Sequence, residues 1–203
     1  MHLPIDIETV KGFMPPDEGR ALYETARDLT GREPVLEIGT YCGKSAVYLG
    51  AACQQTGRSL FALDHHRGSE ENQPGWEHHD PETWDDEAGA METLPFLRQT
   101  LRRAGLEDTV IPIVGRSEQV APFWLQPLSM VFIDGGHGDE PARTDYRLWA
   151  PKVKKGGILA IHDVFPDPAD GGRPPFDIYQ LALSSGLFEE ERAVGSLRIL
   201  KRL

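Results

Sequence analysis

Short apolar runs alternate with segments of helical periodicity along most of the 203-residue chain. Five runs rich in aliphatic and β-branched residues have the pattern of buried strands: 35–38, 60–63, 110–114, 130–133 and 158–161. Apolar residues at helical spacing lie between or beside these runs, at 21–29, 45–51, 92–106, 143–150 and 176–185. Two last runs, 187–191 and 196–200, flank Gly195 and predict a hairpin. The pattern predicts an α/β fold: a Rossmann-like, doubly wound, mostly parallel seven-stranded sheet with a C-terminal antiparallel hairpin.

The segment from about 65 to 91 does not follow this pattern. It has no sustained periodicity, carries eight acidic residues and includes Trp76 and Trp84. An insertion of this length in a compact domain is usually a functional lid or a disordered segment, and tryptophans favour a lid. Its paired histidines could bind zinc, but adjacent side chains rarely converge on one ion, so solvated histidines are expected. The chain is therefore predicted to be a single domain over 1–203 with a mobile acidic lid at about 65–91.

A glycine turn follows the first predicted strand. Glu37 interrupts the apolar run, where a charge is costly unless something pairs with it. Gly39 and Gly43 then permit a sharp turn before helix-compatible residues. Strand, glycine turn and helix in this order form a cofactor site at the carboxyl edge of a parallel sheet. An ordinary strand-to-helix turn is the alternative, and the buried acid favours the cofactor site.

Asp64 closes the second predicted strand about 20 residues beyond the glycine turn, the spacing of an acid that accepts ribose hydroxyls. A solvated turn aspartate is the alternative interpretation. The dinucleotide pattern G-x-G-x-x-G is absent, because Tyr41 and Cys42 occupy positions that must be small. A nicotinamide oxidoreductase is therefore a weaker interpretation than a nucleoside cofactor without a pyrophosphate.

Two further acids end the fourth and fifth predicted strands. Asp134 precedes Gly135, Gly136 and His137, and Asp163 follows His162. If these strands are neighbours, the two carboxylates lie at one sheet edge and repel each other unless a cation lies between them. A hard divalent ion with oxygen ligands, Mg²⁺, fits this arrangement. Strand-end and turn residues without a ligand are the alternative.

The net charge of −11 argues against some partners. Nucleic-acid binders show a basic face, and anionic membranes also attract cations, so neither is expected to bind. No apolar run approaches the length of a membrane span. Cys42 and Cys53, the only cysteines, lack metal spacing, and the first residues lack a secretion signal, so a cytoplasmic location is expected.

Two motifs carry a resemblance to known families. Glu37, Gly39, Gly43 and Ser45 match the Glu-x-Gly-x-x-x-Gly-x-Ser form of the first motif of class I S-adenosylmethionine-dependent methyltransferases, a form common among O-methyltransferases. The stretches 133–137 and 148–164 resemble Mg²⁺-dependent sugar O-methyltransferases of the macrocin and mycinamicin type. The chain is also similar to the compact 1-O-methyltransferase of methylmannose polysaccharide synthesis. The resemblance covers roughly 34–164, the lid excepted.

This resemblance implies S-adenosyl-L-methionine and Mg²⁺ as cofactors and assigns roles to residues. The cofactor contacts that it implies are Glu37, Gly39, Thr40, Tyr41, Gly43, Ser45, Asp64, Arg116, Ser117 and Asp134. The metal ligands are Asp134, His162 and Asp163, although the family has a second acid where this chain has His162. The general base is His137. Catechol-type enzymes carry an Asn where this chain has Val164, which argues against that branch.

The expected activity is metal-assisted methylation of a hydroxyl of a sugar or oligosaccharide, such as a mannoside, by an enzyme that self-associates as a homodimer. A metal-independent small-molecule methyltransferase is one alternative. A non-catalytic nucleoside- or cofactor-binding protein is another, but the joint presence of Glu37, Asp64, Asp134 and His137 argues against it.

Overall fold

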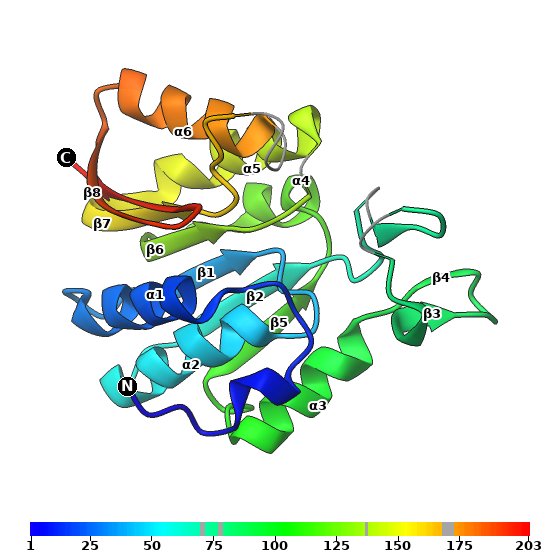
Figure 1. Cartoon of the computed structure of the whole chain (residues 1–203). Coiled ribbons are helices and arrows are strands. Elements are labelled where there is room, and N and C mark those ends of the chain that lie inside the picture. Colours follow the sequence, from blue (N-terminus) through cyan, green and yellow to red (C-terminus); the bar gives the residue numbers. More distant parts are fainter. Residues whose placement is uncertain (70–71, 77–78, 137, 168–172) are drawn as a thin grey trace.

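The structure, a computed structural model, describes residues 1–69, 72–76, 79–136, 138–167 and 173–203 (Figure 1). Within these residues the main sheet has seven strands in the order β5-β2-β1-β6-β7-β9-β8. Their bounds are β1 Val35–Ile38, β2 Leu60–Asp64, β5 Val110–Val114, β6 Leu128–Ile133, β7 Val153–Ile161, β8 Phe188–Val194 and β9 Leu197–Arg202. The first five in this order run parallel, whereas β9 pairs antiparallel with both β7 and β8. The predicted sheet and C-terminal hairpin are confirmed.

Helices cover both faces of this sheet (Figure 1). On one face lie α1 Pro16–Asp28, α2 Lys44–Thr56 and α3 Leu94–Ala104. On the other lie α4 Ser117–Val120, α5 Asp139–Trp149 and α6 Pro174–Ser184. Short 3₁₀ turns occur at η1 Ile7–Thr9, η3 Pro81–Thr83, η4 Ala121–Phe123 and η5 Ala150–Lys152. None of the described helices is both long and apolar enough to cross a membrane.

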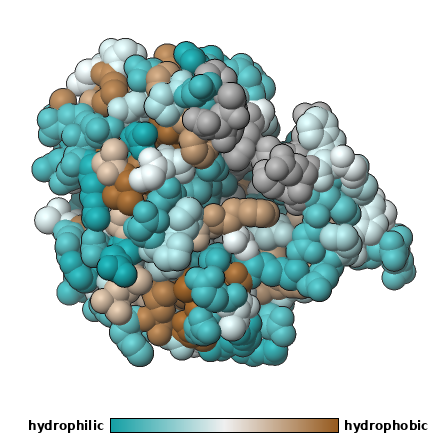
Figure 2. All heavy atoms as spheres, in the orientation of Figure 1, coloured by the Kyte–Doolittle hydropathy of each residue, from teal (hydrophilic) through white to brown (hydrophobic). Residues whose placement is uncertain are grey.

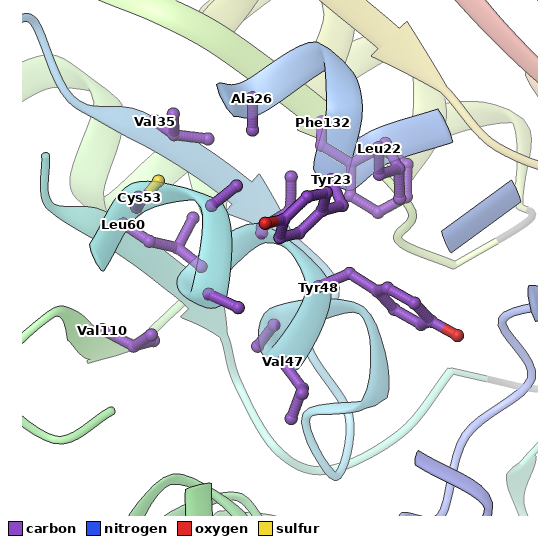
Figure 3. Close-up of a cluster of buried hydrophobic side chains, with 14 of the residues drawn as sticks. Leu22, Tyr23, Ala26, Val35, Val47, Tyr48, Cys53, Leu60, Val110 and Phe132 are labelled. Carbon is purple, nitrogen blue, oxygen red and sulfur yellow. The ribbon is translucent and has the colours of Figure 1, made fainter. Parts of the chain in front are cut away.

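Alternate residues of the central strands supply the two apolar cores. Val35 of β1 and Phe132 of β6 join the core beneath α1, α2 and α3, whereas Leu36 joins the core beneath α5 and α6. Figure 3 shows part of the first of these cores, to which Tyr23 of α1, Tyr48 of α2 and Leu60 of β2 contribute side chains. Burial on both faces explains why these strands read as continuous apolar runs.

Helices α1 and α2 approach each other closely at Gly19. A Cβ atom at this position would lie 2.3 Å from the ring of Tyr48, so only glycine fits. The contact fixes how closely α1 packs against α2. It thereby also fixes Glu18, the preceding residue, whose side chain is almost fully buried.

The main difference from the predicted elements lies in β7. This strand begins at Val153, five residues before the predicted start, and Gly156 and Gly157 lie within it. Its pairing with β6 shifts register between Leu128 and Met130, which accommodates the extra length. Lysines and glycines predict a turn locally, but pairing with a neighbouring strand extends the strand through them.

The segment after β2 leaves the sheet at the carboxyl ends of the strands (Figure 1). It contains η3 and a small antiparallel pair, β3 Trp84–Asp85 with β4 Ala90–Met91. Met91 is buried, and the Lys11 ammonium lies 2.6 Å from an Asp80 oxygen, so the described part is attached to the domain. Its visible surface is mostly hydrophilic (Figure 2). A lid function for 65–91 stays a prediction.

Candidate cofactor and metal site

A cleft of about 810 Å³ opens at the carboxyl edge of the parallel strands. Most of the residues that the sequence assigns to a site line it: Gly39, Thr40, Tyr41, Ser45, Asp64, Arg116, Ser117, Asp134, His162 and Asp163. They come from the loops after β1, β2, β5, β6 and β7, which meet because parallel strands end at one edge. Glu37 is fully buried in β1 rather than exposed in the cleft wall. His137, the predicted base, lies outside the described residues.

The turn between β1 and α2 has a left-handed backbone at three positions: Gly39, Tyr41 and Gly43. Asp64 holds this turn from the end of β2. Its Oδ2 accepts hydrogen bonds from the backbone N–H groups of Thr40, at 3.0 Å, and Tyr41, at 2.8 Å. The structure thus shows that Asp64 anchors this turn, residues 39–43, which we call the cofactor turn because the sequence predicts cofactor contacts there. Since a carboxylate has about four acceptor positions, the ribose role stays compatible with these bonds.

Gly39 also brings the cofactor turn against the end of β6. Its backbone has φ +85°, and a Cβ atom there would lie 2.0 Å from the carbonyl oxygen of Asp134. The Asp134 N–H donates to the carbonyl of Ile38 at 2.9 Å. Only glycine combines this backbone angle with this close approach. The two loops that carry the predicted cofactor and metal residues are therefore one packed unit.

Glu37 lies beneath these loops without an evident partner. Neither carboxyl oxygen has a hydrogen-bond partner among the described residues, and the same holds for the Thr40 hydroxyl. Burial raises the pKa of Glu37 to about 8; the charge of Asp134 adds to this effect, and the hydroxyl of Ser45 opposes it. A buried carboxyl group without a hydrogen-bond partner lowers the stability of the fold, and such groups are typical of functional sites.

Asp134, His162 and Asp163 form the one cluster of possible metal ligands found in the described part of the chain. Their ligand atoms all lie within 4.8 Å of one another. Strands β6 and β7 are parallel neighbours with Ile133 opposite Ile161, so both strand ends deliver their acids to the same place. Asp163 has φ +54°, a conformation uncommon outside glycine. Two carboxylates and an imidazole nitrogen fit a divalent cation.

His162 is buried between this cluster and α1. Its Nδ1 lies 2.9 Å from Asp134 Oδ1 and 3.2 Å from Asp163 Oδ2. Its Nε2 lies 2.5 Å from Oε2 of Glu18. Burial disfavours the charged ring, but the negative charge of Asp134 and the close carboxylate oxygens of Asp163 and Glu18 outweigh this effect and raise the pKa of His162 well above its ordinary value.

Glu18 is a site residue that the sequence patterns did not indicate. It lies on α1, whose apolar residues predict only an amphipathic helix. One signal was present: Glu18 precedes Leu22 and Ala26 at intervals of four, which places an acid on the buried stripe. An acid on such a stripe requires a buried partner.

Ser117, a predicted cofactor contact, has a hydroxyl that already takes part in a protein network. It donates to Asp145, and it accepts a hydrogen bond from Trp149 Nε1 at 2.9 Å. Burial raises the pKa of Asp145 to about 6, and the Ser117 hydroxyl opposes this effect. The network fixes α4 against α5 beside the cleft.

Comparison with known proteins identifies the class. Residues 36–164 match the family described as Methyltransferase domain, which is more than half of the chain, so the protein belongs to this family. The matched range contains the turn between β1 and α2 and the cluster of possible metal ligands. It excludes α1 and the C-terminal hairpin.

Among curated proteins, a catechol O-methyltransferase from Niastella koreensis is 26% identical over 152 residues. The match covers 73% of this chain and 56% of that protein, so the chain spans about half the length of this relative. The name of this relative contrasts with the resemblance to sugar methyltransferases. Val164, which argues against the catechol-type branch in the sequence, is buried in the core beneath α5 and α6.

Solved structures share the fold. The cofactor-bound protein Rv0187 from MTB has a TM-score of 0.68 at 18% identity, covering 96% of this chain and 84% of that one. The O-methyltransferase NovP has a TM-score of 0.67 at 15% identity, covering 92% and 79%. The SAH-bound methyltransferase PaMTH1 from Podospora anserina has a TM-score of 0.66 at 16% identity, covering 94% and 80%.

Proposed function

We propose that the protein is an S-adenosylmethionine-dependent O-methyltransferase that uses a divalent cation to position its acceptor, a hydroxyl of a sugar or oligosaccharide such as a mannoside. One observation carries this proposal. The cluster of Asp134, His162 and Asp163 opens into the same cleft as the glycine turn after β1. A cation and a nucleoside cofactor can therefore lie side by side.

The cleft has the size and polarity that this reaction needs. About 810 Å³ lies in the upper part of the usual range for ligand sites, which suits a nucleoside cofactor and an acceptor together. The acids at its rim favour a cationic cofactor and a neutral acceptor over an anionic one. Mg²⁺ is the cation that the resemblance implies. The sugar acceptor rests on the resemblance of 133–137 and 148–164.

The reaction breaks a carbon–sulfur bond and forms a carbon–oxygen bond, and the acceptor hydroxyl loses a proton. When bound, the sulfonium cofactor supplies the methyl group, and the cation orients and acidifies a hydroxyl. Asp134 and Asp163 would hold the cation, while the turn at Gly39 holds the methyl donor. His137 accepts the proton in this proposal. In this proposal, alignment of the two reactants by these fixed loops supplies a large share of the rate enhancement.

The test is methyl transfer from labelled S-adenosylmethionine to a panel of glycosides, with a catechol included. We expect labelled glycoside in the presence of Mg²⁺, loss of the product with EDTA and its return when the metal is restored. Activity that survives EDTA would favour the metal-independent methyltransferase. Labelling of the catechol alone would overturn the sugar acceptor, and cofactor binding without any product would indicate a binding protein.

Replacement of His137 by alanine is expected to lower kcat by about 10²-fold to 10⁴-fold, the usual contribution of a general base. Cofactor affinity, measured by calorimetric titration, should stay unchanged, because the base does not hold the cofactor. His65→Ala is the control, since it removes a histidine that lines the cleft and has no role in proton transfer in this proposal. A His137→Ala variant with wild-type kcat would refute the assignment.

Cofactor binding is expected to release a proton from Glu37. With a pKa of about 8, this carboxyl is about three-quarters protonated at pH 7.5 in the free protein. A sulfonium cation nearby favours the ionised form and lowers this pKa, so binding should release up to about three-quarters of a proton. Calorimetry in buffers of different ionisation enthalpy measures this number.

Two controls isolate this effect. The Glu37→Gln variant should bind without the release, and S-adenosylhomocysteine, which lacks the sulfonium charge, should release less. Equal release by the variant and the wild-type protein would contradict the role of Glu37.

A further inference from the structure

We infer that Glu18 fixes His162 as a nitrogen ligand, so that the metal site of this protein selects a first-row transition ion over Mg²⁺. The inference rests on the proposed function, because it concerns the cation of the same site. The ion that we infer differs from the one that the resemblance implies. The resemblance implies Mg²⁺, whereas one nitrogen and two oxygen ligands favour a first-row transition ion.

The His162 ring directs its Nδ1 toward the two acids of the cluster. The side chain is 5% exposed, and its Nδ1 has no hydrogen-bond partner of suitable geometry among the described residues, although carboxylate oxygens of Asp134 and Asp163 lie near it. A buried ring nitrogen aimed between two carboxylates has the position of a ligand atom. It completes a cluster of one nitrogen and two oxygens.

Glu18 fixes this ring from its other side, since Oε2 of Glu18 lies 2.5 Å from Nε2 of His162. A histidine that ligates a metal usually donates its other N–H to a carboxylate or carbonyl, which fixes its tautomer and orientation. Glu18 fits that role because it is buried at the inner side of the ring. The hydrogen bond leaves only Nδ1 for a cation.

Glu18 is itself held in place by the turn between β8 and β9. Its Oε1 accepts a hydrogen bond from the backbone N–H of Ser196 at 2.6 Å. Gly195 brings the β8–β9 turn close, since a Cβ atom there would lie 2.1 Å from the same oxygen. Elements outside the matched family range, α1 and the C-terminal hairpin, thus combine to orient one ligand.

The consequence concerns the choice of ion. Mg²⁺ prefers oxygen ligands, whereas imidazole suits Fe²⁺, Co²⁺, Ni²⁺ and Zn²⁺. Replacement of a carboxylate by an imidazole also removes one negative charge that would favour a hard cation. A mixed site of this kind therefore binds Co²⁺ more tightly, relative to Mg²⁺, than an all-oxygen site does.

The test measures the affinities for Co²⁺ and Mg²⁺ by calorimetric titration of the whole chain without cofactor, so no activity is required. We expect His162→Asp, which restores an all-oxygen site, to lower the Co²⁺ preference at least about tenfold. The visible absorption of bound Co²⁺ should also change between the two proteins. A preference unchanged by this substitution would overturn the inference.

A second pair of variants tests Glu18 as a positioning residue. We expect Glu18→Gln to weaken Co²⁺ binding about 10-fold to 100-fold, the usual effect of losing such a partner. Glu24→Gln is the matched control: Glu24 lies on the same helix, and its carboxylate pairs with Arg192 on the surface at 2.9 Å. Equal affinities in the two variants would contradict the role of Glu18.

Folding is checked by thermal unfolding of each variant. If His162→Asp does not fold, the expected cause is that Glu18 loses its partner and is left as a buried unpaired charge. In that case the double variant His162→Asp with Glu18→Gln, which removes this charge, is used in place of the single variant. Failure of this inference and failure of the proposed function are distinguishable. If the wild-type protein prefers Co²⁺ over Mg²⁺ no more than His162→Asp does, but turnover still depends on a metal, only the inference is overturned. If turnover is insensitive to EDTA, the metal has no role in the reaction and the proposed function fails as well.

Discussion

An Asp134→Asn variant is expected to lose methyl transfer by roughly a hundredfold or more, since metal coordination contributes several kcal/mol to such reactions. Asparagine keeps the size of the side chain and removes its charge. The loss should therefore arise from the site rather than the fold. The measurement is kcat/KM with labelled S-adenosylmethionine, together with a titration of the divalent cation, which should bind more weakly by a similar factor.

The reason lies in the position of Asp134. Its carboxylate faces His162 at 2.9 Å, and its backbone packs against Gly39 of the cofactor turn. Asp163→Asn should show the same loss of metal affinity, because its carboxylate belongs to the same cluster. Asp139→Asn is the control: this acid follows at the start of α5, where it is largely exposed and pairs with Arg143. A variant at Asp134 that matches this control would contradict the metal site.

A Gly39→Ala variant is expected to lose about 2–4 kcal/mol of stability and to bind the cofactor poorly. The methyl group would meet the Asp134 carbonyl at 2.0 Å, at a backbone angle that alanine disfavours. Relief requires the cofactor turn and the end of β6 to separate. Denaturant unfolding measures the stability, and calorimetry measures the affinity for S-adenosylmethionine.

Gly57→Ala is the matched control for this substitution. Gly57 has a similar angle, φ +65°, at the end of α2, but nothing lies within 4 Å of the position of its Cβ. This variant should lose only about 1–2 kcal/mol, the cost of the left-handed backbone. If the two variants lose equal stability, the contact between the loops does not have the importance assigned to it.

The central strands could be predicted because they are buried on both faces: Val35–Ile38 is predicted with its bounds and is fully buried. Val110–Val114 lies at the edge of the sheet and is partly exposed, but its apolar, β-branched composition also predicts its bounds. The start of β7 is missed because residues 153–157 contain lysines and glycines, and the strand begins at Val153 through its pairing with Leu128 of β6. Local composition carries no signal of a partner that lies elsewhere in the chain.

The site divides in the same way. Gly39, Asp134 and Asp163 could be found because residues at the ends of parallel strands must meet. The anchoring role of Asp64 was not predicted, since hydrogen bonds to backbone N–H groups leave no sequence pattern. Glu18 was missed for a different reason. It contacts His162, which lies 144 residues further along the chain, and helical periodicity does not predict contacts at such a separation in sequence.

The central claim is that a divalent cation and a sulfonium nucleoside bind side by side at the carboxyl edge of the sheet. A crystal grown with S-adenosylhomocysteine and Co²⁺, with anomalous data collected at the cobalt edge, tests it most directly. We expect one strong peak within bonding distance of Asp134, His162 and Asp163, next to a nucleoside on the turn at Gly39. A cobalt peak elsewhere, or a nucleoside outside this cleft, would contradict the account.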